Sequence, residues 1–229
     1  MTKTTKTKIH HTCSLGSRCH STQLLKRNAW KEASYPFDWI MSNHKSNIHC
    51  IENDFKLFLD KSQYVDITST QCGHRYYDAK MFYHHNPLRY KDDYNYYCRC
   101  IKRFKDLLQL SEHKLFIMIF VNGEYNSHLD SFPKEIVEFN TRFSKHTSNY
   151  TLLVIIHHPN KQQNSHTFTT YKNNDIDSKK ETDDNNNSIH LLELHTLSVS
   201  NGVEFVNKND NVYLDNILKM HYNFLKTNR

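Results

Sequence analysis

A cysteine within a strand–turn–helix pattern is the first candidate for chemistry. It is Cys19, in the stretch HTCSLGSRCHSTQLLKRN (11–28). The stretch begins like a buried strand, turns at Gly16 and continues like a helix, for which Ser17 is the expected N-cap. A helix N-terminus and the adjacent Arg18 both favour the thiolate, which is the nucleophilic form of cysteine. We therefore expect Cys19 to be the most reactive thiol, with a pKa below that of a free cysteine.

A nucleophilic thiol needs a base, and the base needs a group that orients it. His84 closes a strand-like segment at 75–85 and is the candidate base. Asp38 or Asn86 could orient its imidazole. The residues alone leave this choice open.

The same residues also fit a binding or structural role. Free cysteine is commonly a buried packing residue, and a turn before a helix can hold a phosphate- or sugar-bearing ligand without covalent chemistry. Phe37 and Trp39 are expected to fill the core. A Cys19 sulfur within hydrogen-bond reach of His84 favours catalysis, whereas a buried Cys19 favours binding. The residues expected to contact a ligand are Ser14, Gly16, Ser17, Arg18, Trp39 and Asn86.

Composition narrows the class of protein. The chain has 229 residues, a net charge of +6, and basic residues spread along its length. Nucleic-acid binding is not expected, because proteins dedicated to it concentrate their charge on one face. The six cysteines and 17 histidines lack the Cys-x-x-Cys or His-x-x-x-His spacing of zinc sites, so we expect no metal and no cofactor.

Neither a membrane span nor a signal peptide is expected. The longest apolar runs are LFIMIFV (115–121) and LLVII (152–156), far short of the about 20 residues that a span needs. The opening residues MTKTTKTK lack an apolar core. We expect a soluble cytoplasmic protein with free thiols. The heavy use of Asn, Lys, Ile and Tyr suggests an AT-rich genome, as in some large DNA viruses, protists and low-GC bacteria. The substrate and the oligomeric state stay unassigned at this stage.

Hydrophobic periodicity predicts the elements that hold these residues. We expect a disordered tail at 1–8 and one domain at 9–229, with a polar insertion at about 160–188. Strands alternate with helices and the middle strands are continuously apolar, which predicts a single layered α/β/α domain with a mostly parallel central sheet. Ligands of such sheets bind beyond the carboxyl ends of the strands, where the SLGSRC turn lies. The expected strands are 9–14, 75–85, 115–121, 152–156, 189–194 and an edge strand at 203–205, and the expected helices are 18–30, 48–58, 94–108, 132–143 and 214–225.

Two N-terminal motifs resemble the opening of the putative papain-like cysteine peptidase family. They are Ser-Leu-Gly-x-x-Cys at 14–19 and Pro-Phe-Asp-Trp at 36–39. His84 in MFYHHN matches the strand-end histidine of that family, and KLFIMIF (114–120) matches its later strand.

The resemblance implies a thiol hydrolase that acts on an amide or a thioester. It gives Cys19 the role of nucleophile, His84 that of base and Asp38 that of orienting acid. Family members often carry an acidic residue directly after the histidine, whereas His85 and Asn86 follow it here.

Overall fold

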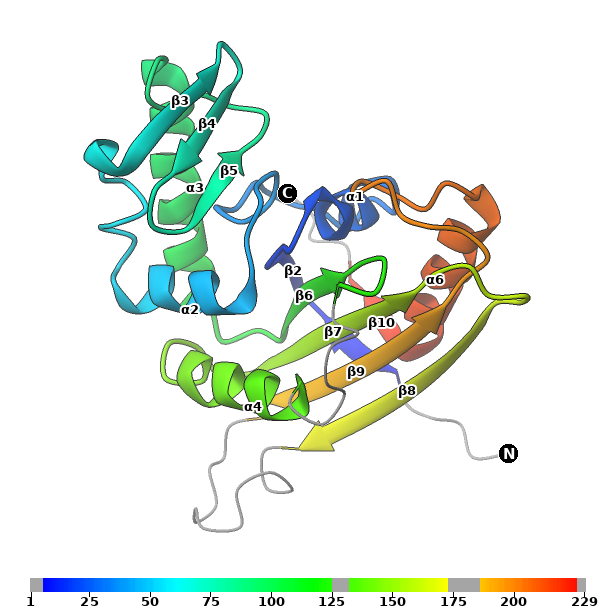
Figure 1. Ribbon diagram of the computed structural model, residues 1–229. Helices are drawn as coiled ribbons and strands as arrows, with labels where there is room; N and C mark the ends of the chain where they lie inside the picture. Colours follow the sequence, from blue (N-terminus) through cyan, green and yellow to red (C-terminus); the bar gives the residue numbers. More distant parts are fainter. Residues whose placement is uncertain (1–5, 125–131, 173–185, 226–229) are drawn as a thin grey trace.

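The computed structural model describes residues 6–124, 132–172 and 186–225. Its main sheet is mostly parallel, as the sequence predicts, and only the edge strand β8 runs antiparallel to its neighbour (Figure 1). The five strands lie in the order β2 (His11–Ser14), β6 (Lys114–Phe120), β7 (Tyr150–His158), β9 (Ser188–His195) and β8 (Ser165–Lys172).

The middle strands are apolar throughout because both of their faces are covered. Every residue of β6 is buried, as is all of β7 except its last residue. Successive side chains of a strand point to opposite faces. Phe116 and Met118 therefore join one core cluster, while Leu115 and Ile117 join another.

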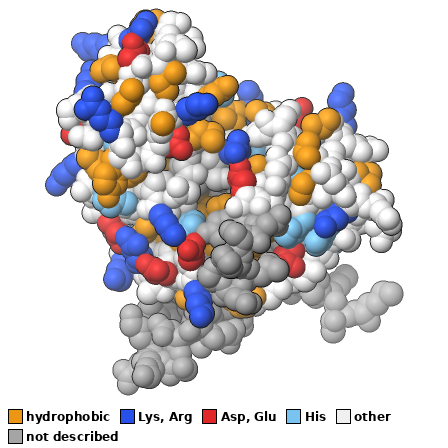
Figure 2. Space-filling view, viewed as in Figure 1, with side chains coloured by type: hydrophobic (Ala, Val, Ile, Leu, Met, Phe, Trp, Pro, Cys, Tyr) orange, Lys and Arg blue, Asp and Glu red, His pale blue; other side chains and the backbone are white. Residues whose placement is uncertain are grey.

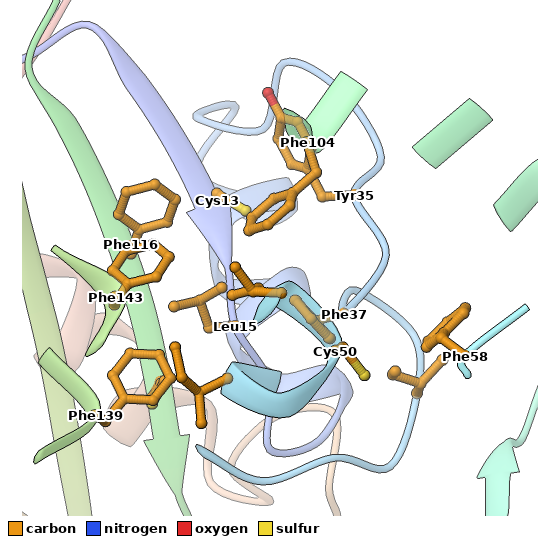
Figure 3. Packing of buried hydrophobic residues seen from close by; sticks show 14 of the residues in the cluster. Cys13, Leu15, Tyr35, Phe37, Cys50, Phe58, Phe104, Phe116, Phe139 and Phe143 are labelled. Carbon is orange, nitrogen blue, oxygen red and sulfur yellow. The ribbon is translucent and has the colours of Figure 1, made fainter. Parts of the chain in front are cut away.

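Five helices of the described chain also contribute to these two clusters. Leu24 and Leu214 bring α1 (Cys19–Arg27) and α6 (Lys208–His221) into the cluster of Leu115. The other three helices contribute to the cluster of Phe116, which Figure 3 shows from close by. They are α2 (His44–Glu52), α3 (Lys91–Leu108) and α4 (Phe132–Phe143).

A second, antiparallel sheet stands beside the main one, together with α3 (Figure 1). Its strands are β3 (Tyr64–Thr68), β4 (Gln71–His74) and β5 (Asp78–Phe82), and a short 3-10 helix, η1 (Lys61–Gln63), precedes them. The mixed α/β class is confirmed, while a single α/β/α layering stays a prediction. Sequence periodicity finds only a strand at 75–85 here, because four of the five β3 residues are exposed and give no apolar alternation.

The chain ends differ from the expected tail and closing helix. β1 (Thr7–Ile9) pairs in parallel with β10 (Tyr222–Phe224), so a disordered tail reaching residue 8 is wrong, and residues 1–5 lie outside the described part. The helix expected at 214–225 ends at His221 for the same reason. A pairing between strands this distant in sequence leaves no local periodic signal.

The polar insertion is also shorter than expected. Residues 165–172 form β8, which pairs with all of β9, so the insertion boundary at 160 is wrong. The remainder of that prediction, 173–185, lies outside the described residues. The edge strand expected at 203–205 is absent from the described chain there, where only an isolated bridge joins Ser200 to Phe205.

Two helix boundaries near the site also differ from the boundaries expected from the sequence. α1 begins at Cys19 with Arg18 as its N-cap, one residue later than a Ser17 cap implies, and it ends at Arg27. α2 ends at Glu52, because the following turn places Phe55 at a φ of +59°. Phe55 still reaches the core, so the apolar spacing that predicts a helix there reflects burial alone.

Candidate active site

The turn between β2 and α1 is fixed to the neighbouring strand. Gly16 has a φ of +82°, and a Cβ at this position would collide with the Ser42 hydroxyl, so glycine is required. Ser17 Oγ donates to the Ile119 carbonyl (2.8 Å), and Ile119 N–H donates to the Gly16 carbonyl (3.1 Å). The backbone that leads into Cys19 is therefore held on both sides.

Two buried serine hydroxyls complete this turn from inside. Ser14 Oγ and Ser21 Oγ lie 2.6 Å apart. Gly16 N–H donates to Ser14 Oγ (3.2 Å), and Ser21 Oγ donates to the Gly16 carbonyl (3.1 Å). The sequence places Ser14 and Ser17 among ligand contacts, but the structure uses both hydroxyls to shape the turn.

Cys19 and His84 come together as the sequence predicts for a nucleophile and its base. Cys19 is the first residue of α1, and its Sγ lies 3.7 Å from His84 Nε2. His84 is exposed and lies two residues beyond the end of β5. Contacts between a nucleophile and its base are often loose without substrate, so this distance is compatible with proton transfer.

Burial of the thiol contradicts the expected low pKa. Cys19 is only 8% exposed, and this burial raises its pKa, outweighing its own backbone amide and Arg18, which lower it. Arg18 is also less available to the thiolate than the sequence suggests. Its Nε donates to Glu124 Oε1 (2.6 Å), and the carboxylate offsets part of the guanidinium charge.

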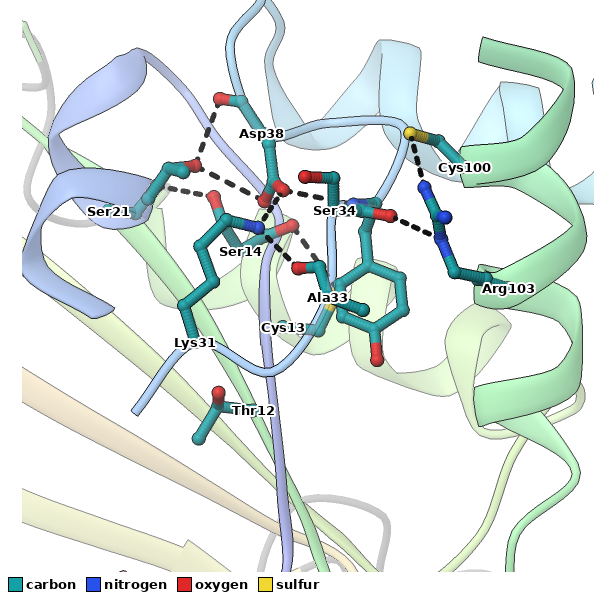
Figure 4. A network of polar contacts seen from close by, with 12 residues as sticks. Thr12, Cys13, Ser14, Ser21, Lys31, Ala33, Ser34, Asp38, Cys100 and Arg103 are labelled. Atoms are coloured by element: carbon teal, nitrogen blue, oxygen red, sulfur yellow. Dashed lines mark hydrogen bonds and ion pairs between the residues drawn. The ribbon is translucent and has the colours of Figure 1, made fainter. Parts of the chain in front are cut away.

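Asp38 is buried away from His84. Lys31 Nζ lies 2.5 Å from Asp38 Oδ2, and Tyr35 N–H donates to the same oxygen (2.9 Å), as Figure 4 shows for the lysine. Thr22 Oγ1 donates to the Asp38 carbonyl (2.9 Å). Within the described residues neither carboxylate oxygen bonds to His84. The structure therefore does not bring the expected orienting acid to the base.

Asp38 instead joins the motif at 36–39 to α1. Its pKa is raised by burial, an effect that the Lys31 ammonium opposes. Through Thr22 it contacts the second turn of α1, three residues after Cys19. This buried network fixes the loop that carries Trp39 against the helix that carries the nucleophile.

Trp39 lies at the site, whereas its neighbour Phe37 lies in the core. Phe37 is fully buried, but Trp39 is half-buried and its ring meets the His84 ring edge-on, with centroids 6.4 Å apart at 86°. Lys26 Nζ lies 5.9 Å from the centre of the indole. The sequence predicts that Trp39 packs in the core, but the structure places its ring against the imidazole of His84.

Asn86 supports the loop after β5. Its side-chain Nδ2 donates to Asp66 Oδ1 (2.8 Å) and to the Thr68 carbonyl (2.7 Å), and its Oδ1 accepts from Arg89 N–H (3.0 Å). These contacts tie the His84 loop to β3. They occupy the amide, which makes no contact with His84 within the described chain.

Sequence reasoning missed a buried polar group beside the nucleophile. His20 Nδ1 lies 2.9 Å from Ser200 Oγ, and Asn122 exchanges two hydrogen bonds of 2.7 Å with the Ser200 backbone. Asn122 N–H also donates to His157 Nδ1 (3.1 Å). Burial lowers the pKa of His20 to about 3. His20 and Ser200 are 180 positions apart. Asn122 and His157 lie at the carboxyl ends of the parallel strands β6 and β7, and Ser200 lies in the segment that follows β9, which is a usable signal.

Metal ligation and membrane insertion find no support in the described residues. No group of three or more His, Cys, Asp or Glu side chains converges there in a way that could hold a metal ion. No helix in the described ranges combines the length and the apolarity needed to cross a bilayer.

Comparison with known proteins gives one result. A family model described as putative papain-like cysteine peptidase matches residues 10–174, which is most of the chain. The chain belongs to this family. The match includes both Cys19 and His84 and ends before β9 and α6. No curated protein and no solved structure matches significantly.

Proposed function

We propose that this family member is a thiol-dependent hydrolase of the cysteine peptidase type, with Cys19 as nucleophile and His84 as general base. The observation that carries the proposal is the 3.7 Å approach of Cys19 Sγ to His84 Nε2, which joins residues 65 positions apart. The bond attacked is an amide or a thioester. A helix N-terminus, a thiol and an imidazole at one point supply the three groups that acyl transfer needs.

Burial of the thiol decides how the proton moves. Because the pKa of Cys19 is raised, the thiol is mostly protonated near neutral pH. Sγ attacks the carbonyl carbon while its proton passes to His84 Nε2, and the carbonyl oxygen becomes an oxyanion. The Arg18 side chain does not cap the first-turn amides of α1, so these amides are suited to stabilise that oxyanion.

The second half of the reaction uses the same imidazole. His84 gives its proton to the leaving nitrogen or sulfur as the carbonyl re-forms, which leaves an acyl group on Cys19. Water then attacks this thioester and loses a proton to His84, releasing the acid and restoring the thiol. Trp39 restricts rotation of the His84 imidazole through its edge-on ring contact. Asp38 contributes indirectly, because it fixes the loop that carries Trp39.

A non-catalytic binding module is the second candidate. It would use the turn at 14–19 to hold a phosphate- or sugar-bearing ligand, and the low exposure of Cys19 favours it. The hydroxyls of Ser14 and Ser17 already bond within the turn and to β6, which leaves the first-turn amides as the main anion donors. The catalytic proposal accounts for His84, whereas the binding module leaves its position unexplained.

Timed alkylation with iodoacetamide, read by peptide mass spectrometry, tests the proposal. We expect the native protein to label at Cys19 and His84→Ala to slow that labelling. Cys98, which is half-buried on α3, is the internal control and should label equally in both proteins. Labelling of Cys19 only after denaturation would overturn the hydrolase proposal and favour the binding module.

The free cysteines also indicate the cellular compartment of the protein. All six cysteines are free, and four of them besides Cys19 are buried. Free buried thiols persist in reducing compartments. We include a cytoplasmic location in the proposal, to be checked by thiol counting on the protein isolated under native conditions.

A further inference from the structure

A cavity of about 530 Å³ lies between α2, α4 and the turn that joins β4 to β5. Its volume falls within the range of sites that take a small molecule or a side chain. Figure 2 shows acidic, basic and histidine side chains close together over α2 and α4. Ile48 and Phe139, both 2% exposed, form an apolar floor.

Three aromatic rings form one wall of this cavity. The ring of His49 lies 5.0 Å from that of Tyr76 and 5.7 Å from that of Tyr77, and the two tyrosine rings meet edge-on at 5.1 Å. His49 Nδ1 and Tyr77 Oη lie 2.9 Å apart, which fixes both side chains. Tyr76 remains 59% exposed. A further ring placed against Tyr76 would extend the cluster in its preferred edge-to-face geometry.

The basic groups that line the cavity have acidic partners. Lys45 Nζ lies 3.0 Å from Glu135 Oε1, and His44 Nε2 lies 3.1 Å from Glu135 Oε2. Arg142 Nε donates to Glu52 Oε1 (2.9 Å). Because the basic side chains already have acidic partners, the cavity favours an uncharged group. The exposed aromatic ring is then the main feature left for recognition.

The cavity begins close to the nucleophile. Ser42 N–H donates to the Ser17 carbonyl (3.1 Å), and the next residue, Asn43, lines the cavity. Cys19 lies two residues beyond Ser17. Consecutive Cα atoms are about 3.8 Å apart and hydrogen-bonded partners about 5.5 Å, so the Cα atoms of Cys19 and Asn43 are at most ~17 Å apart. His49, in the aromatic wall, lies farther along α2 by about 9 Å, so its Cα is at most ~26 Å from that of Cys19. About eight extended residues span that distance.

We infer that this cavity binds an aromatic side chain of a polypeptide substrate, within about eight residues of the bond that Cys19 attacks. The inference deepens the proposed function and rests on it. It assigns the substrate class from the aromatic wall, the paired charges and the reach to the thiol.

The probe is a seventeen-residue peptide of alternating glycine and serine, with 4-fluorophenylalanine at its centre and blocked ends. Binding is measured by ¹⁹F NMR on Cys19→Ala, which has no thiol at the site. We expect a shifted or broadened fluorine signal that Tyr76→Ala removes. Tyr90→Ala, which alters another exposed tyrosine away from the cavity, should leave the signal shift intact.

Protection of Cys19 from alkylation measures whether the bound peptide reaches the nucleophile. The peptide at millimolar concentration should slow iodoacetamide labelling of Cys19 in the wild-type protein at least threefold. N-acetylphenylalaninamide, which is too short to reach the thiol, should bind without protecting it. A peptide with cyclohexylalanine at the centre keeps the apolar area but lacks the aromatic ring, and it should protect less.

Each outcome separates this inference from the proposed function. Absence of Tyr76-dependent binding, or binding without protection of a reactive Cys19, overturns the inference and leaves the hydrolase proposal standing. Displacement of the peptide by adenosine at a lower concentration assigns the cavity to a nucleoside and also overturns it. If Cys19 proves unreactive, the hydrolase proposal fails, and the fluorine signal on Cys19→Ala still decides whether the cavity takes an aromatic side chain.

Discussion

Cys19 and His84 meet from two regions of the molecule that are built differently. Cys19 stands on a turn held by backbone bonds to β6 and by two buried serine hydroxyls. His84 stands on an exposed loop beyond the smaller sheet, where Asn86 anchors the backbone and Trp39 meets the imidazole. The nucleophile is thus fixed by hydrogen bonds, whereas the base is positioned by a ring contact, which restricts a side chain less.

This difference predicts that the thiol region tolerates little change. Backbone hydrogen bonds and glycine conformation define a single geometry, and a substituent at Gly16 collides with Ser42. An edge-on ring contact contributes about 0.5–1.5 kcal/mol and allows small rotations of the imidazole. We expect changes near Cys19 to alter folding and changes near His84 to alter reactivity.

Acid should destabilise the folded protein through its buried histidines, among them His20 beside the nucleophile. Burial lowers the pKa of His20 to about 3 and that of His157 and His190 to about 4, against about 6.5 in an unfolded chain. The unfolded chain therefore binds more protons below pH 6.5, and stability present above that pH is lost as the pH falls. At pH 5 each histidine should cost ~2 kcal/mol of unfolding free energy.

Urea denaturation followed by circular dichroism from pH 7.5 to pH 5 measures this loss. A His20→Gln variant should show a shallower fall than the wild-type protein, because one proton-linked group is gone. The same slope in both proteins would show that His20 is not buried as a neutral group.

Substitutions of the neighbouring aromatic residues Phe37 and Trp39 should differ in their effect on stability. Phe37→Ala removes a fully buried ring and should lower the unfolding free energy by ~3–5 kcal/mol. Trp39→Ala removes a half-buried ring and should cost clearly less. The denaturation midpoints of the two variants give the measurement, and equal losses would place Trp39 in the core instead of at the site.

Loss of the base should slow the thiol without unfolding the protein. His84→Ala is expected to reduce the rate of Cys19 alkylation at pH 7.5 about tenfold, because general-base assistance is commonly worth 10²–10⁴-fold in a full reaction and less for a small alkylating agent. His85→Ala, one residue along the same loop, is the matched control. An equal effect of the two substitutions would point to disturbance of the loop and away from a specific role for His84.

The pH profile of alkylation gives the smallest but most direct test of thiol burial. Because burial raises the pKa of Cys19, its labelling rate should still be rising with pH above the ~8.5 of a free thiol. Trp39→Ala should slow labelling a few-fold at every pH and leave the shape of the profile unchanged. A plateau below pH 7 would show that the helix N-terminus and Arg18 outweigh burial after all.

Some of the fold is readable from local pattern. The periodic helices at 91–108 and 132–143 and the apolar strands at 114–120 and 150–158 follow the sequence closely, because burial on one or two faces sets a repeat that neighbours share. β3 is not predicted, because most of its residues are exposed and give no apolar alternation. β8 is not predicted, because it adjoins a polar segment and is included in the same expected insertion.

The sequence by itself determined the candidate nucleophile and base. Glycine spacing, a thiol at a helix start and a histidine after a strand are local features, and each follows from backbone geometry within a few residues. Together with the resemblance to the family motifs, those features identify Cys19 and His84 and the expected place of the turn at the edge of the sheet.

Only the tertiary structure decided the surroundings of these two residues. It buried the thiol and so raised its pKa, directed Asp38 to Lys31, and placed Trp39 against the imidazole. Desolvation and long-range pairing depend on which distant segments pack together. Because no local repeat encodes that packing, the sequence could name the reacting groups but could not set their electrostatics.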